Sequence, residues 1–235
     1  IYEDENILLV DKPVGMVVHE DESGGSDTLI NRIKSYLYRK GEYHPENELS
    51  FAPALCNRID RNTCGIVIAA KNAESLRILN QKIRDRELTK LYLCIACGKV
   101  TPDSATLTAY LEKNSDTNTV KISDKKTKSN LTIKTKYKVI AYNGENSLLK
   151  VDLLTGRTHQ IRAHLAYIGH ALLGDGKYGN NKLNKKYGFK YQALCSYELQ
   201  FKFTTDAGCL SYLDGKCFKA KAPDFVKMFG SNIKL

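Results

Sequence analysis

The sequence has no long apolar run. The best candidates, Ile7–Val10 and Gly65–Ala70, are far shorter than the roughly 18–20 residues that a helix needs to cross a bilayer. The chain also lacks a cationic start followed by an apolar segment and a small-residue cleavage site, so nothing in it indicates secretion. We therefore expect no membrane association.

Several motifs of nucleotide and metal enzymes are also missing. The chain has no GxxxxGK[ST] or GxGxxG loop to hold the phosphates of a nucleotide, and no GxSxG nucleophile elbow. His159 and His164 do not have HExxH spacing, so they do not present two metal ligands on one helical face. Cys94 and Cys97 have zinc-like spacing without a second pair, and their apolar surroundings favour core thiols. We expect neither a metal nor a cofactor.

Positive charge, by contrast, is abundant. Among 235 residues, Lys and Arg number 36 against 26 Asp and Glu, a formal net charge of +10. Such a balance points to a polyanionic partner, with RNA or DNA first and an anionic membrane surface second. The 7 cysteines are scattered and odd in number, which fits reduced thiols in a cytoplasmic protein better than a disulfide framework.

No repeat, Pro-rich linker or low-complexity block divides the chain, which favours one continuous domain over residues 1–235. Apolar and alternating segments predict strands, and helical spacing predicts helices, two of them capped by Asp27 and Asn72 and a third closed by Gly169. The predicted strands are 7–10, 65–70, 91–96, 131–140, 147–154 and 197–203, and the predicted helices are 28–39, 73–86 and 158–168. Because strands outnumber helices without regular alternation, the predicted fold class is α+β.

The lysines gather in two segments. Seven of them lie between Lys121 and Lys138 with one acid, Asp124, and five lie between Gly176 and Tyr197, interleaved with aromatic residues and no acid. Solvated lysine faces would explain both segments. A surface that follows a nucleic-acid backbone, with rings available for stacking, would explain them equally well.

Two polar segments could carry chemistry, and the first covers residues 57–65. Asp60 lies there at the mouth of the predicted strand 65–70, with Arg58 and Arg61 beside it. The arginines could keep this carboxylate ionised and directed into a cleft. An Asx turn explains the same residues, and physical reasoning alone favours this simpler alternative.

The second segment joins a predicted strand to a predicted helix through a glycine turn. Its two guanidinium groups suit a phosphate or a carboxylate. A capped helix with its polar side chains in water is the alternative, but the concentration of polar groups weakens it. These groups are Arg157, His159, Gln160, Arg162 and His164.

Together the two segments resemble a known family. NRIDRNTCG at 57–65 resembles the HRLDxxTSG motif of the RluA-type (RluA/RluC/RluD) pseudouridine synthases, and TGRTHQIRAH at 155–164 resembles their TGRTHQIRxH motif. KLY at 90–92 is similar to the family's KxY motif, ILLVDKPVGMVVH at 7–19 to its opening, and AKAP at 220–223 to its closing turn. The match runs in order over nearly the whole chain.

The resemblance implies an enzyme that converts uridine in RNA to pseudouridine without metal or cofactor. It makes Asp60 the essential carboxylate, acting either as a nucleophile on the anomeric carbon or as the base that starts glycal formation. Arg162 resembles the arginine that pairs with this aspartate. Tyr92 resembles the tyrosine that stacks on the base and helps to remove its proton.

The resemblance also suggests how the substrate is held. A uridine must leave its stack to reach such a pocket, and Arg58 is expected to fill the vacated space with help from Asn57. Arg157, His159 and Gln160 are expected to bind substrate, and the lysine and tyrosine stretches to hold flanking phosphates and bases. Asn57, Ile59 and Cys64 replace the usual His, Leu and Ser, which affects positioning but none of the three catalytic residues.

The fold implied by the family is a curved, mainly antiparallel mixed sheet with flanking helices and a central RNA-binding cleft. We expect a monomer acting on large-subunit ribosomal RNA first and tRNA second. Because the chain begins with Ile1, an N-terminal RNA-binding domain is expected to be missing upstream. The rival is a non-catalytic RNA-binding or ribosome-assembly protein on the same fold, and a DNA-binding module has no motif to support it.

Overall fold

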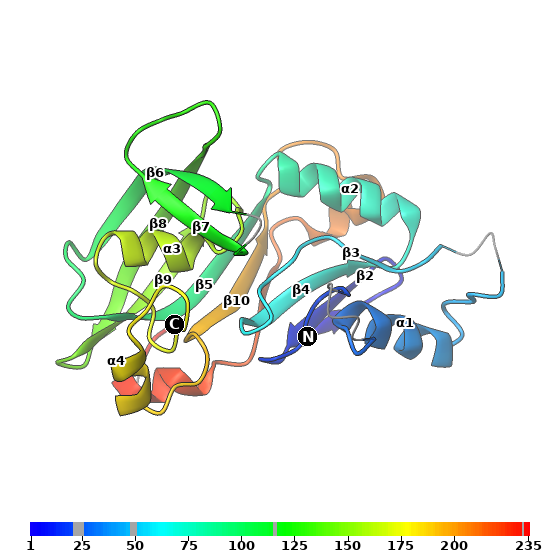
Figure 1. The fold of residues 1–235 in the computed structure, drawn as a ribbon. Coiled ribbons are helices and arrows are strands. Elements are labelled where there is room, and N and C mark those ends of the chain that lie inside the picture. Colours follow the sequence, from blue (N-terminus) through cyan, green and yellow to red (C-terminus); the bar gives the residue numbers. More distant parts are fainter. Residues whose placement is uncertain (21–25, 48–50, 115–116, 232) are drawn as a thin grey trace. The chain divides into compact units, whose positions relative to one another are not determined.

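The computed structural model describes residues 1–20, 26–47, 51–114, 117–231 and 233–235. The chain divides into two compact units, and each has strands and helices of its own (Figure 1). Unit 1 consists of Ile1–Thr89 and Ser196–Lys221, and unit 2 consists of Lys90–Cys195 and Ala222–Leu235.

Unit 1 is built on strands whose order of neighbours is β1-β2-β4-β10, and the β1–β2 and β2–β4 pairs are antiparallel. Two short strands extend it, since β3 pairs with β4 and β11 pairs with β10. The strands are β1 (Tyr2–Glu3), β2 (Ile7–Lys12), β3 (Ala54–Leu55), β4 (Cys64–Ala70), β10 (Leu194–Phe201) and β11 (Cys217–Lys219). The strands predicted at 7–10, 65–70 and 197–203 are therefore confirmed, the last with its start moved to Leu194 and its end to Phe201.

Helix α1 (Leu29–Arg39) is capped by a different residue from the one predicted. The Thr28 hydroxyl accepts a hydrogen bond from the Asn31 N–H at 3.3 Å, whereas Asp27 forms an ion pair with Arg32 at 2.6 Å. The prediction of an Asp27 cap is wrong because Thr28, with extended backbone, is already at the helix boundary. The face expected to be apolar is buried: Leu29, Ile30, Ile33 and Leu37.

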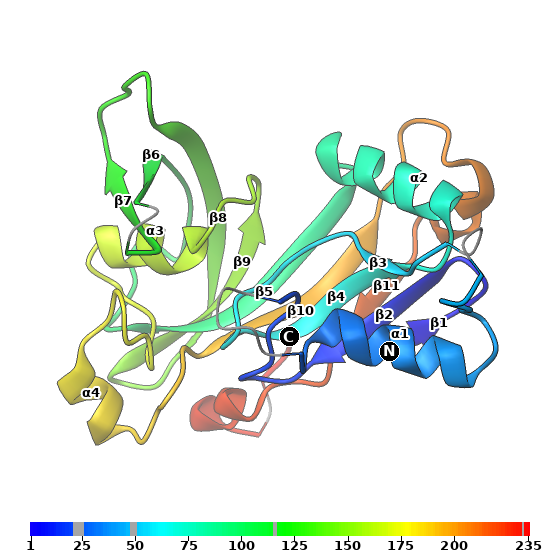
Figure 2. The ribbon, with the colours of Figure 1, turned by 45° about the vertical axis from the view of Figure 1, so that its right-hand side comes forward.

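Helix α2 (Ala73–Arg84) confirms the second predicted cap. The Asn72 side chain accepts a hydrogen bond from the Ser75 N–H at 2.8 Å. The helix ends at Arg84, two residues short of the prediction, because Arg86 adopts a left-handed backbone with φ of 64°. Figure 2 shows α2 running alongside β4, against which it packs.

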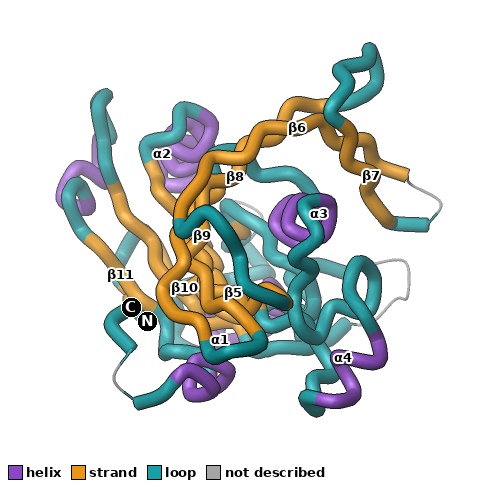
Figure 3. The backbone as a smooth tube through the Cα atoms, turned by 90° about the vertical axis from the view of Figure 1, so that its left-hand side faces the viewer, coloured by secondary structure: helices purple, strands orange, loops and turns teal. Residues whose placement is uncertain are grey.

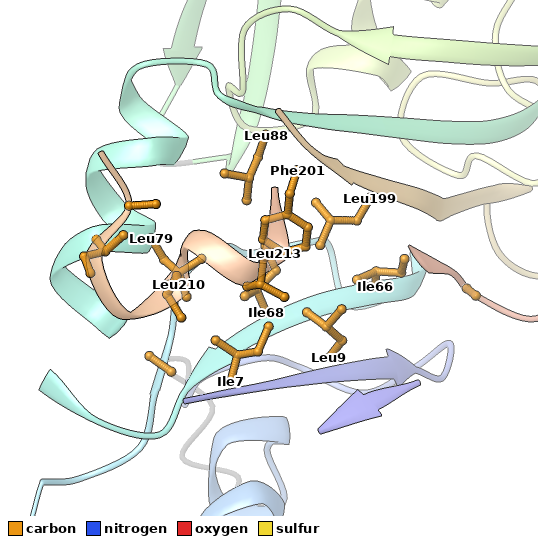
Figure 4. Close-up of a cluster of buried hydrophobic side chains, with 14 residues drawn as sticks. Ile7, Leu9, Ile66, Ile68, Leu79, Leu88, Leu199, Phe201, Leu210 and Leu213 are labelled. Atoms are coloured by element: carbon orange, nitrogen blue, oxygen red, sulfur yellow. The ribbon is translucent and has the colours of Figure 1, made fainter. Parts of the chain in front are cut away.

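The core of unit 1 joins side chains from segments far apart in the sequence (Figure 4). Strands β2, β4 and β10 contribute from the sheet, α2 contributes Leu79, and the short 3₁₀ helix Gly208–Leu213 contributes two leucines. The labelled members of this cluster are Ile7, Leu9, Ile66, Ile68, Leu79, Leu88, Leu199, Phe201, Leu210 and Leu213.

Gly65, in β4, is required by its surroundings. Its φ is +103°, and a Cβ atom built on it would lie 2.2 Å from the backbone oxygen of Ser196. A methyl group there forces the sheet backbone apart as well as straining φ.

We expect Gly65→Ala to destabilise the protein by about 2–4 kcal/mol, or to lower Tm by about 5–15 °C, because backbone atoms must move to admit the methyl group. Gly176→Ala is the matched control, since a Cβ atom at Gly176 meets nothing within 4 Å. Differential scanning calorimetry of both variants checks this, and equal Tm values for the two would contradict it.

The strands of unit 2 have the order β5-β9-β8-β6-β7, and each neighbouring pair is antiparallel. Its strands are β5 (Leu88–Cys97), β6 (Ser104–Asn114), β7 (Thr119–Ser123), β8 (Leu131–Tyr142) and β9 (Asn146–Leu153). The strands predicted at 91–96, 131–140 and 147–154 are confirmed, whereas the β6–β7 hairpin was not predicted. Antiparallel sheets with few helices confirm the α+β class.

Helix α3 (Gln160–Tyr167) lies on the concave side of the curved β7-β6-β8 ribbon (Figure 3). Its Ala163 joins a buried cluster with Leu111 of β6 and Ile133 of β8. The helix begins two residues later than predicted because His159 has a left-handed backbone, with φ of 52°, and Gly169 closes the helix as expected.

The two cysteines with zinc-like spacing lie in β5. Cys94 is 0 % exposed, and burial raises its pKa. Cys97 packs against a cluster formed by Ile95, Leu173 and Ala193. Their interpretation as core thiols is confirmed.

Within the described ranges, no helix is both long and apolar enough to span a membrane. Helix α4 (Asn181–Lys186) and the 3₁₀ helix Asp224–Phe229 complete unit 2.

Candidate active site

Asp60 lies in unit 1, in a tight turn that leads into β4. The N–H of Thr63 donates to the backbone oxygen of Asp60 at 3.0 Å, and the N–H of Gly15 donates to the backbone oxygen of Arg61 at 2.9 Å. Asp60 is half-buried, and the preceding Ile59 is buried. The predicted turn is confirmed, and it is anchored on both sides of the carboxylate.

Lys12, at the end of β2, holds this turn through a hydrogen bond to its backbone, a role that was not predicted from the sequence. Its side chain is 0 % exposed, which is rare for lysine. Its Nζ donates to the backbone oxygens of Pro13 at 2.9 Å, Met16 at 2.8 Å and Arg61 at 2.9 Å, using all three ammonium donors. Burial lowers the pKa of Lys12 to about 8, and the nearby Asp60 carboxylate acts in the opposite direction. Lys12 therefore connects β2 to the Asp60 turn.

Asn57 and Arg58 precede the turn. The Oδ1 atom of Asn57 accepts a hydrogen bond from the Ile68 N–H at 2.8 Å, so the side chain is fixed against β4. Its buried Nδ2 has no hydrogen-bond partner among the described residues. Arg58 is exposed and lies near His19, whose pKa is lowered by burial and by the Arg58 charge. Asn57 thus retains a donor, and Arg58 retains a cation at the surface.

Gln160, in unit 2, is surrounded by protein groups. It is 2 % exposed. Its Oε1 accepts from the Thr155 hydroxyl at 2.8 Å and from the Arg157 N–H at 3.1 Å, while its Nε2 donates to the backbone oxygen of Lys134 at 3.1 Å and to the Thr135 hydroxyl at 3.0 Å. All hydrogen-bonding positions of the carboxamide are occupied. Gln160 therefore fixes the turn before α3 onto β8.

His159 and Arg162 meet on one aromatic ring. The Nδ1 atom of His159 lies 2.9 Å from the Tyr178 hydroxyl, which accepts a hydrogen bond from the Val120 N–H at 2.9 Å. The Arg162 guanidinium lies over the Tyr178 ring at 5.3 Å from its centroid. Tyr178, which was not predicted as a site residue, thus links β7 to both side chains.

Arg162 forms a buried, bidentate ion pair with Asp175. The distances are 2.7 Å from Nε to Oδ2 and 3.0 Å from Nη2 to Oδ1. The two residues are 6 % and 0 % exposed. The Arg162 charge keeps the pKa of Asp175 below its usual value despite burial. Asp175 therefore fixes the Arg162 guanidinium in one orientation.

Tyr92 and Arg157 complete the predicted set. Tyr92 lies in β5 opposite Val151 of β9, and it is 5 % exposed. Arg157 is exposed in the turn before α3. In unit 2 the structure therefore brings together His159, Gln160 and Arg162 at the start of α3.

A family model described as RNA pseudouridylate synthase matches residues 6–167 of this sequence. The chain belongs to this family. The matched range contains the Asp60 turn, Tyr92 and Arg162. The resemblance found in the sequence is confirmed.

Curated relatives agree with this assignment. The chain is 38% identical over 208 residues to the uncharacterized RNA pseudouridine synthase MG370 of Mycoplasma genitalium, covering 86% of this chain and 62% of the relative. It is 33% identical over 179 residues to the ribosomal large subunit pseudouridine synthase D of Borreliella burgdorferi, covering 76% of this chain and 54% of the relative. The chain thus spans 54% to 62% of the length of these two family members.

Solved structures share the fold. Human RNA Pseudouridylate Synthase Domain Containing 1 superimposes with a TM-score of 0.70 at 22% identity, covering 95% of this chain and 82% of that one. Human RNA Pseudouridylate Synthase Domain Containing 4 gives 0.73 at 19% identity, covering 97% and 89%. The α+β fold expected from the resemblance is therefore that of pseudouridylate synthases.

The described parts of this family member contain no group of three His, Cys, Asp or Glu side chains that could hold a metal ion. His164 instead belongs to the scaffold. It is 1 % exposed, and its Nδ1 lies 3.0 Å from the Thr135 hydroxyl that also binds Gln160. Burial lowers the pKa of His164 to about 4.

This histidine predicts a pH-dependent stability. The pKa of His164 is about 4 in the folded state and near 6.5 in the unfolded state, so its contribution to the free energy of unfolding is complete above about pH 6.5. As the pH falls towards 4, the unfolded state takes up a proton that the folded state does not, and the free energy of unfolding decreases by about 3 kcal/mol. We expect urea denaturation at pH 7 and pH 4.5 to show a smaller pH effect in His164→Gln than in the wild type. Identical pH effects would contradict this, and His44→Gln, at an exposed histidine, is the control.

Proposed function

We propose that residues 1–235 form the catalytic domain of an RNA pseudouridine synthase, acting as a monomer without metal or cofactor. The observation that carries the proposal is the Asp60 turn, a carboxylate held in place by Lys12 inside the segment that matches the family. A protein that only bound RNA would not need Asp60, Tyr92 and Arg162 together.

The reaction exchanges one bond for another. The bond between N1 of uracil and C1′ of ribose breaks, a bond between C5 and C1′ forms, C5 loses a proton and N1 gains one. Asp60 starts the reaction, either by attacking C1′ or by removing a proton from the sugar so that a glycal forms. Tyr92 stacks on the base and assists proton removal from C5, and Arg162 pairs with the Asp60 carboxylate.

The substrate uridine leaves its stack before reaction, which costs a few kcal/mol. Arg58 is exposed and keeps its charge at the surface, which supports its role in filling the vacated space. Asn57 assists by holding the start of the Asp60 turn against β4, through the hydrogen bond that its Oδ1 accepts from the Ile68 N–H. Arg157 and His159 bind the substrate, whereas the saturated hydrogen bonds of Gln160 favour a role in holding the turn rather than the RNA.

We propose large-subunit ribosomal RNA as the first substrate and tRNA as the second. The ribosomal relative from Borreliella burgdorferi is matched over 54% of its length at 33% identity. A relative from Saccharomyces cerevisiae named tRNA pseudouridine(32) synthase, mitochondrial, is 32% identical over 187 residues but is matched over 37% of its length. The two relatives match similar shares of this chain, 76% and 78%, and the order follows the slightly higher identity of the ribosomal one.

The experiment compares total RNA from a strain lacking this gene with RNA from its parent, by carbodiimide modification and primer extension. We expect one or more pseudouridine stops to disappear and to return with the wild-type gene but not with Asp60→Asn. The RNA that carries the lost stop identifies the substrate class. Loss of no stop, in this strain and in one also lacking related synthases, would favour the non-catalytic RNA-binding protein. The purified enzyme is expected to be insensitive to EDTA.

A further inference from the structure

The β6–β8 part of unit 2 has one covered face and one open face. On β8, Ile133 and Thr135 point towards α3, where they are buried. The alternate residues Lys134, Lys136 and Lys138 are exposed, and side chains alternate between the two faces of a strand. The three lysines therefore lie on the face of β8 that is turned away from α3. Figure 3 shows α3 on the concave side of this part of the sheet.

Hydroxyl groups line the lysine row on its β6 side. Thr108 and Thr106 are the register partners of Lys134 and Lys136, and both threonines are exposed. These five residues, Lys134, Lys136, Lys138, Thr106 and Thr108, are called the β8 lysine face. They carry ammonium and hydroxyl donors and no aromatic ring.

Lysines outnumber acids on and beside this face. None of its three lysines forms an ion pair with an acid in the described part of the chain, although Asp152 of β9 is the register partner of Lys136. Lys138 is paired across the strands with Lys150, another lysine. This excess of positive charge favours a polyanionic partner.

The second lysine segment is organised differently. Lys186 forms an ion pair with Glu145 at 2.8 Å, and Tyr187 and Phe189 pack against the cluster around Ile95. Its charges are thus partly neutralised and two of its rings contribute to the core. The β8 lysine face is the stronger candidate for a phosphate-binding surface.

We propose that the β8 lysine face binds the sugar–phosphate backbone of an RNA duplex, an arm of the substrate separate from the nucleotides that bind near Arg162. This rests on the proposed function, because it assumes that the substrate is RNA. The Cα atoms of successive lysines on one face of a strand are about 6.7 Å apart, a spacing that suits a row of phosphates. Recognition of single strands relies on stacking rings, which this face lacks, whereas duplex RNA is bound through phosphates and 2′-hydroxyls.

The arrangement also separates two parts of the RNA. Arg162 is on α3, on the concave side of the sheet, and the β8 lysine face is on the other side. Phosphates bound by the lysines cannot belong to the nucleotides in contact with α3. The sequence interpretation in which this lysine stretch holds phosphates flanking the target uridine is therefore replaced, for these three lysines, by contact with a more distant arm.

The test uses the full chain and a 16-base-pair RNA duplex of G and C only, which contains no uridine. We expect Lys134→Gln/Lys136→Gln/Lys138→Gln to bind this duplex about 10-fold or more weakly at 100 mM salt, in fluorescence anisotropy. The slope of log K against log salt is expected to fall by about 2–3, the share of three phosphate contacts. Tm should not fall, because the substituted side chains are exposed.

The matched control is Lys202→Gln/Lys227→Gln/Lys234→Gln, which removes the same charge at exposed positions elsewhere. Equal loss of affinity in both triple variants, or none in either, would overturn the proposal. The proposal would also be overturned if the Lys134/Lys136/Lys138 variant lost binding to phosphatidylserine vesicles while its affinity for the duplex was unchanged. That result would indicate that the β8 lysine face binds a membrane surface. Because the duplex has no uridine, these outcomes are independent of whether the chain isomerises uridine.

Discussion

Replacing Asp60 with Asn is expected to reduce isomerisation by about 10⁴-fold or more, because the amide can neither attack C1′ nor act as a base. The substitution keeps the size of the side chain and leaves the backbone bonds of Thr63 and Gly15 in place. Affinity for RNA should therefore stay within a few-fold. Single-turnover tritium release from [5-³H]uridine-labelled RNA, together with anisotropy binding, measures both quantities.

The control for this variant is Asp103→Asn, at an exposed aspartate in unit 2, for which we expect wild-type rates. Persistent activity in Asp60→Asn would make the residue part of an ordinary turn and would remove the basis of the proposed mechanism. Loss of both activity and RNA binding would point instead to a collapsed turn, which circular dichroism and Tm would reveal.

Asp175→Asn is expected to give the largest loss of stability, about 3–5 kcal/mol, because it removes the carboxylate that holds the buried Arg162 guanidinium in a bidentate ion pair. The same carboxylate also accepts the N–H groups of Lys177 at 2.8 Å and Tyr178 at 3.1 Å, so the following turn loses two charge-assisted bonds. Urea denaturation at pH 7 measures the effect.

The control is Glu145→Gln, which breaks the exposed Lys186–Glu145 ion pair in the same unit and should cost less than about 1 kcal/mol. Similar losses in the two variants would contradict the assignment of Arg162–Asp175 as a buried pair. The double variant Arg162→Met/Asp175→Leu should recover much of the stability without recovering activity, which separates the scaffold role from the catalytic one.

The elements that the sequence predicted correctly are those with strong local signals. Helix α2 has an Asn cap and a clear apolar face, and β4 is an uninterrupted apolar run. Both signals lie within a dozen residues and depend little on distant partners. The prediction of the residue that caps α1 was wrong because Asp27 and Thr28 are both good capping residues, and only the backbone conformation decides between them.

The β6–β7 hairpin escaped prediction because its apolar signal is weak. Along β6 the residues with buried side chains are Ala109 and Leu111, and most of the others are exposed serines, threonines and charged residues. An edge hairpin of this kind is specified by its pairing with β8 and by the cover of α3, which are non-local contacts.

In the candidate site, the two long motifs identified roles for Asp60 and Arg162, whereas the residues that hold them stood in similar segments, 7–19 and 169–179, without a predicted role. Lys12 lies 48 positions before Asp60, and Asp175 lies 13 positions after Arg162. A lysine after an apolar strand and an aspartate in a glycine-rich turn are ordinary surface residues in a sequence. Only the fold shows that both are buried and bonded.

The composition of the unit 1 core determines when it can form during synthesis. Ile7, Leu9, Ile66 and Ile68 leave the ribosome early, but their partners Leu199 and Phe201 come after Lys90–Cys195 has been made. At about 5–20 residues per second this delay is on the order of 5–20 s. During this delay the first strands have an exposed apolar face. Strands β6, β7 and β8 of unit 2, by contrast, pair only with strands that are near in sequence. The part of the chain that is translated first is therefore completed late, and until then its apolar face is open to contacts with other chains.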